Sequence, residues 1–66
     1  MTAADIYATR LVTVRDQIEA LRAQVEAHAR RAAANPDDWN LAGDLGHALD
    51  RLRDLVAFLS ASAVIR

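Results

Sequence analysis

The feature that most constrains this chain is the spacing of its apolar residues, which recur in alternating steps of three and four along two segments separated by one proline. Such spacing places the residues on one stripe of an α-helix and is typical of a coiled coil. The first stripe consists of Ala4, Tyr7, Leu11, Val14, Ile18, Leu21, Val25, His28 and Ala32. The second consists of Ala42, Leu45, Leu49, Leu52, Val56, Leu59 and Ala63. The pattern therefore predicts an all-α chain.

Local signals mark the ends of the first helix, which we expect over about 3–34. Thr2 and Asp5 have the spacing of a capping box, in which each residue bonds to a backbone amide of the other. At the far end, Pro36 disfavours the helical conformation at Asn35, so the helix should stop just before that residue.

The second helix is expected over about 36–62. Asn35 can serve as its N-cap, and Pro36 suits the first helical position because it has no amide hydrogen to leave unbonded. Gly43 and Gly46 lie inside this helix, where each costs about 1 kcal/mol relative to alanine. Two helices joined by so short a turn predict an antiparallel helical hairpin.

The hairpin is expected to form a single domain, residues 1–66, whose core is thin. Fifteen of the apolar residues are alanine, and only twenty larger ones remain to exclude water. A lone core in so short a chain rarely supplies more than about 3 to 5 kcal/mol. The chain has no cysteine, which removes disulfides and thiolate metal sites as means of stabilisation. We therefore expect self-association.

The two sides of the expected hairpin differ in charge. One side is charged, with Glu19 expected near Arg53 and Arg22 near Asp50. The other side has apolar and amide residues that the contact between the two helices cannot cover. A second copy is expected to cover them, giving a homodimer that forms a four-helix bundle; scattered surface hydrophobes on a monomer are the alternative. The predicted self-association interface is Leu41, Ala48, Leu55, Phe58, Ile65, Gln17 and Gln24.

A second apolar group is expected at the end of the hairpin away from the turn. Tyr7 and Phe58 are interpreted first as core or interface residues, with docking of another protein as the alternative. Trp39, near the turn, is interpreted as packing on small residues. The possible partner patch is Ile6, Tyr7, Val12 and Val64.

The titratable residues predict no catalytic, cofactor or metal site. His28 falls in the first stripe and His47 on the outer face of the second helix, so heptad phase separates them. We interpret His28 as a packed, hydrogen-bonded histidine, with a pH-sensitive interface group and a metal ligand as alternatives. Asp37 and Asp38 are explained by their position at a helix start. We therefore expect that the protein is not an enzyme.

Charge gives no strong indication of nucleic-acid binding, because eight arginines face nine carboxylates and the net charge is -1. The expected architecture nevertheless resembles that of the plasmid-encoded Rop regulators, hairpin dimers of about this length that bind paired RNA loops. This resemblance implies an alternative function, a regulatory hairpin dimer that binds RNA or DNA. Its possible nucleic-acid contacts are Arg10, Arg30 and Arg31.

The sequence favours a small non-catalytic helical module that associates with itself and acts through an unknown protein partner as a regulator, adaptor or assembly subunit. Neither a signal peptide nor an apolar stretch of the 18 residues that a membrane span needs is visible, so we expect a cytoplasmic protein without a membrane partner.

Overall fold

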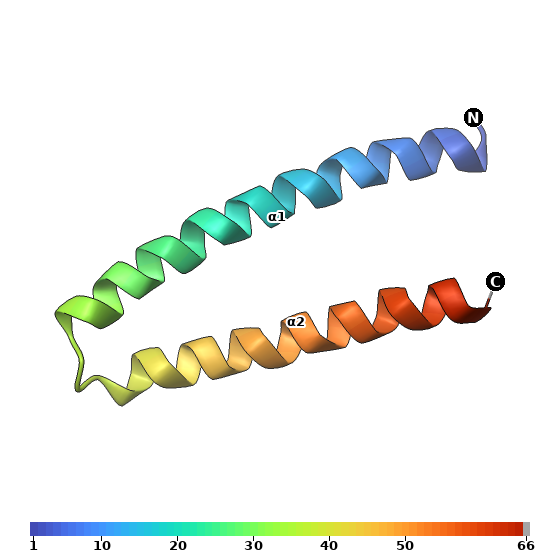
Figure 1. Ribbon diagram of the computed structural model, residues 1–66. Coiled ribbons are helices and arrows are strands. Elements are labelled where there is room, and N and C mark those ends of the chain that lie inside the picture. The colour runs from blue at the N-terminus through green and yellow to red at the C-terminus, as the bar shows by residue number, and fades with distance from the viewer. Residues whose placement is uncertain (66) are drawn as a thin grey trace. The chain divides into compact units, whose positions relative to one another are not determined.

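The computed structural model describes the backbone of residues 1–65 and the side chains of residues 1–62. The chain is divided into two units, Met1–Ala34 and Asn35–Arg66. Each unit contains one continuous α-helix, α1 (Ala3–Ala34) in the first and α2 (Trp39–Ile65) in the second (Figure 1). Residues 1–65 contain no strand. The all-α prediction is confirmed, and α1 has the predicted bounds.

The capping box predicted at the start of α1 is confirmed. The amide of Thr2 donates to Oδ2 of Asp5 over 3.1 Å, and the amide of Asp5 donates to Oγ1 of Thr2 over 3.2 Å. The first backbone bond of the helix follows, from the amide of Ile6 to the carbonyl of Thr2 at 3.1 Å. Two amides that would otherwise lack helical partners are therefore bonded, which fixes the first residue of the helix.

The predicted bounds of the second helix are wrong by three residues at each end, because α2 begins at Trp39 rather than Pro36 and ends at Ile65 rather than residue 62. Pro36 and Asp37 instead occupy the middle of a tight turn, closed by a 3.1 Å bond from the amide of Asp38 to the carbonyl of Asn35. Proline fits this turn position because its fixed φ matches the second residue of a β-turn.

Asp38, not Asn35, caps α2. Its Oδ1 accepts a 3.0 Å bond from the amide of Asn40, and its carbonyl accepts a 3.2 Å bond from the amide of Leu41. Aspartate and asparagine are about equally good N-caps, so residue preference alone does not choose between them. Asp38 is therefore the residue at which the bonding pattern of α2 starts, since its carbonyl accepts the first backbone bond and its side chain bonds an amide of the first turn.

The two glycines of α2 adopt ordinary helical conformations. Neither Gly43 nor Gly46 has a positive φ. Apart from its two chain neighbours and the nearby backbone of its own helix, a Cβ atom added to either glycine would meet no described atom within 4 Å. Backbone conformation therefore does not require glycine at these positions, and each has room for a methyl group.

Candidate self-association surface

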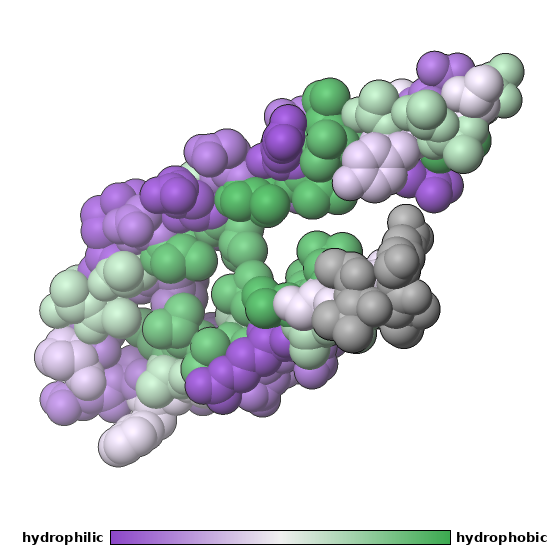
Figure 2. Space-filling model, turned by 45° about the vertical axis from the view of Figure 1, so that its right-hand side comes forward, coloured by the Kyte–Doolittle hydropathy of each residue, from purple (hydrophilic) through white to green (hydrophobic). Residues whose placement is uncertain are grey.

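Each helix carries an exposed apolar stripe. On α1, Val14 is 49% exposed and Ile18 is 54% exposed; on α2, Val56 is 65% exposed. Figure 2 shows hydrophobic side chains gathered along one side of α1 and hydrophilic side chains along another. None of the side chains from residue 1 to residue 62 is buried. The apolar area that a helix of this kind must remove from water is thus still available for packing.

The predicted interface residues of α2 follow one line along the helix. Leu41, Ala48 and Leu55 are seven residues apart, which is almost two turns, so their side chains lie on the same stripe. Leu41 and Ala48 are half-buried, whereas Leu55 is 58% exposed and Phe58 is 69% exposed. The side chain of Ile65 lies outside the described residues.

The segment from Leu55 to Leu59 is apolar on more than one side of α2, as expected from the placement of Val56 in the stripe and of Phe58 on the flank beside it. Val56 and Phe58 are two residues apart, which places them about 160° apart around the helix axis. Both side chains are more than 60% exposed. One neighbouring helix covers a stripe of roughly 100°, so it cannot cover both residues.

On α1, the predicted interface residues Gln17 and Gln24 are both exposed. They lie seven residues apart and therefore share one line of the helix surface. Nearer the N-terminus, the hydroxyls of Thr9 and Thr13 donate to the carbonyls four residues earlier, those of Asp5 and Thr9, over 3.1 and 3.2 Å. Both hydroxyl hydrogens are therefore already bonded within the helix, which leaves these two side chains with less hydrogen-bonding capacity for other partners than their residue type indicates.

A shallow groove borders Leu55 on α2 and is otherwise lined by polar residues. Within it, Nε of Arg51 donates a 3.2 Å hydrogen bond to Nε2 of His47. This bond joins residues four apart on the exposed surface of the helix and requires that Nε2 of the imidazole carry no proton. The groove residues are His47, Asp50, Arg51, Asp54 and Leu55.

The possible partner patch is not assembled by α1 alone. Ile6 is 38% exposed, Tyr7 68% and Val12 60%. Ile6 and Val12 lie about 120° apart around the axis, so they belong to different sides of the helix. The side chain of Val64 lies outside the described residues.

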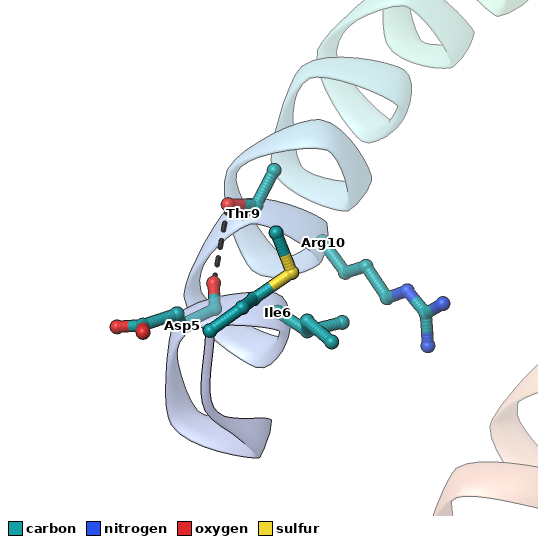
Figure 3. Close-up of a pocket in the computed structure, with 5 residues that line it drawn as sticks. Asp5, Ile6, Thr9 and Arg10 are labelled. Carbon is teal, nitrogen blue, oxygen red and sulfur yellow. Dashed lines mark hydrogen bonds between the residues drawn. The ribbon is translucent and has the colours of Figure 1, made fainter.

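Ile6 does take part in a small surface pocket at the start of α1. Figure 3 shows the bond from the hydroxyl of Thr9 to the carbonyl of Asp5, with Arg10 extending away from the helix. The pocket is formed by the first turns of α1 together with Met1, which precedes the helix, and its residues are Met1, Asp5, Ile6, Thr9 and Arg10.

The arginines proposed for nucleic-acid contact do not form one cluster. Arg10 lies twenty residues before Arg30, which corresponds to about 30 Å along α1 at 1.5 Å per residue. Between them, Nε of Arg22 lies 4.0 Å from Oε1 of Glu19, an ion pair in which both side chains are 74% exposed. A carboxylate thus sits within the stretch that a basic stripe would have to occupy.

The titratable residues are arranged as helix caps and surface pairs. Asp38 caps α2 and Asp5 belongs to the capping box of α1. His28 is half-buried, whereas His47 is exposed. Among the described residues, no group of three or more histidine, aspartate or glutamate side chains is arranged to hold a metal ion.

No protein-family model, curated protein or solved structure matches this chain. Neither α1 nor α2, over the residues described, is long and apolar enough to cross a membrane.

Proposed function

We propose that this protein is a small non-catalytic module that associates with itself as a helical hairpin dimer, forming a four-helix bundle, and acts in the cytoplasm through a protein partner. The observation that carries the proposal is the apolar segment Leu55–Leu59 of α2, which exposes large side chains on nearly opposite sides of the helix. If α1 covers one side of this segment in a hairpin, the other side still needs a second chain.

Self-association is favoured by the apolar surface area that it removes from water. Burying a large apolar side chain stabilises a protein by about 1.5 to 3 kcal/mol relative to leaving it exposed. A two-helix chain has a single contact between helices, whereas a four-helix bundle gives each helix at least two neighbours. Dimerisation therefore removes from water the side chains, such as Leu55 and Phe58, that a hairpin leaves outside.

Sedimentation or light scattering across nanomolar to millimolar protein tests this proposal. The expected result is a dimer at micromolar concentration. Leu55→Asp should dissociate or unfold it, because an unpaired carboxylate would be placed in an apolar contact. Ala57→Asp is the matched control, since position 57 lies about 160° from position 55 and about 100° from position 58 around α2, on the line of Asp50, and the same charge there should leave the dimer intact.

A wild-type protein that stays a folded monomer over the whole range would overturn the proposal. So would a Leu55→Asp protein as dimeric as the control.

The same sample distinguishes the RNA- or DNA-binding alternative that the Rop-like architecture implies. Binding by a protein that neutralises phosphates weakens steeply as salt rises. Titration with a paired RNA loop and with duplex DNA at two salt concentrations is expected to give no salt-dependent binding. Binding that is lost with salt and with Arg30→Ala would favour the nucleic-acid function instead.

A further inference from the structure

A strip along α2 combines apolar ends, a small residue at its centre and charges of opposite sign between them. Its members are spaced by three and four residues, so they occupy about 80° of the helix circumference. Leu41 and Ala48 are half-buried, and Leu55 is 58% exposed. The strip consists of Leu41, Asp44, Ala48, Arg51 and Leu55.

This strip is complementary to an inverted copy of itself. Leu41 and Leu55 each lie seven residues from Ala48. Asp44 lies four residues before Ala48 and Arg51 three residues after it. Turning a second α2 end for end about Ala48 therefore sets Leu41 against Leu55 and, within one residue of register, Asp44 against Arg51. The same matches occur twice, as a two-fold interface requires.

A parallel pair would have the opposite electrostatics. It would bring Asp44 against Asp44 and Arg51 against Arg51, and like charges in register destabilise an interface. Charge thus selects both the partner, which is a second copy of this chain, and its antiparallel orientation.

Two local features prepare the strip for this contact. The bond between Nε of Arg51 and Nε2 of His47 uses only one edge of the guanidinium, and the terminal nitrogens remain able to bind a carboxylate in two-point geometry. Ala48 at the centre carries only a methyl group, so two helices can approach to the short end of the usual 8 to 10 Å separation of helix axes.

We infer that two copies of α2 pack antiparallel about a two-fold axis at Ala48, with Asp44 of each copy paired with Arg51 of the other. This inference rests on the proposed self-association and gives that association its geometry.

The first test places a cysteine at the axis. Ala48→Cys introduces the only cysteine of the chain, so any disulfide must join two copies. Disulfides form between residues whose Cα atoms are about 4.4 to 6.8 Å apart, a distance that only residues near the axis reach. Oxidation is expected to give a covalent dimer that keeps its helical circular dichroism. Ala61→Cys, away from the strip, is the control that should remain uncrosslinked.

The second test is a charge exchange, which reports on orientation. Asp44→Arg should raise the dimer dissociation constant by about tenfold or more, because it brings two arginines together on both sides of the axis; Arg51→Asp should do the same with two carboxylates. The double exchange should restore the wild-type constant, and rising salt should shrink the loss in each single variant. Asp50→Arg, on another side of α2, is the matched control and should change little.

The outcomes separate the two proposals. A monomeric wild-type protein overturns self-association and this geometry with it. A wild-type dimer that gives no disulfide at position 48 leaves self-association standing and overturns the contact between α2 helices. If a disulfide forms at position 48 but the double exchange does not restore the wild-type dissociation constant, the antiparallel charge pairing is overturned.

Discussion

The N-cap of α2 provides the sharpest test of the local structure. Oδ1 of Asp38 accepts the amide of Asn40 over 3.0 Å, and α2 has no acidic residue in its own first turn. Asp38→Ala removes this acceptor and returns the amide to water. Loss of such a cap costs about 0.5 to 2 kcal/mol, a range that for aspartate includes the contribution of about 0.3 to 1 kcal/mol from its negative charge near the helix start. We expect a total in the upper part of that range, about 1 to 2 kcal/mol.

Thermal unfolding followed by circular dichroism measures this loss. In a domain of this size 1 kcal/mol corresponds to about 4 to 8 °C in Tm, so Asp38→Ala should melt roughly 5 to 15 °C lower. The protein concentration must be fixed, because the Tm of an associating protein depends on it. Asp38→Asn separates the two contributions, since asparagine keeps the capping oxygen and removes only the charge. Asp38→Asn should therefore lower the Tm less than Asp38→Ala does, and this decrease should become smaller as the salt concentration rises.

Asp37→Ala is the matched control, because it removes the same carboxylate one residue earlier, within the turn and outside the cap. Equal losses for Asp37→Ala and Asp38→Ala would show that charge alone matters and that the cap contributes nothing. If Asn35→Ala lost 0.5 to 2 kcal/mol while Asp38→Ala lost none, the helix in solution would start at Pro36 and the reasoning would be refuted.

Four further substitutions are expected to give measurable results. Gly43→Ala and Gly46→Ala should each stabilise the protein by about 0.4 to 1 kcal/mol in urea unfolding, because both positions have ordinary helical φ and room for a methyl group; a loss would indicate that another chain's backbone packs there. Thr2→Ala should cost about 0.5 to 2 kcal/mol, and a double-mutant cycle with Asp5→Ala should show that the two losses are not additive. Glu19→Gln should change stability by less than about 0.5 kcal/mol, since its ion pair is exposed; a larger loss would contradict a purely surface role.

Sequence patterns predicted the helices well where the deciding interactions join residues a few positions apart. The capping box of Thr2 and Asp5 fixed the start of α1, and the proline after Asn35 fixed its end. The stripes of apolar residues gave the helical class for the same reason, because a period of three to four is a property of the local chain.

Sequence patterns did not predict the bonds between side chains within each helix, because several partners compete for each group. The expected pairing of Glu19 with Arg53 stays a prediction, and within α1 Oε1 of Glu19 lies 4.0 Å from Nε of Arg22. The bond that the exposed His47 accepts from Arg51 was likewise not predicted. Exposed charges have many partners of nearly equal energy, so spacing alone does not choose among them.

The sequence by itself determined that two helices form, where α1 begins and ends, and which residues lie on each apolar stripe. Only the three-dimensional structure decided where α2 begins. Asn35 and Asp38 are both good caps, and Pro36 suits either the first turn of a helix or the second position of a β-turn. These local preferences are nearly equal, so they do not choose between the two starts. In the structure the bond from the amide of Asp38 to the carbonyl of Asn35 closes a turn over Pro36 and Asp37, and Oδ1 of Asp38 caps the helix that follows.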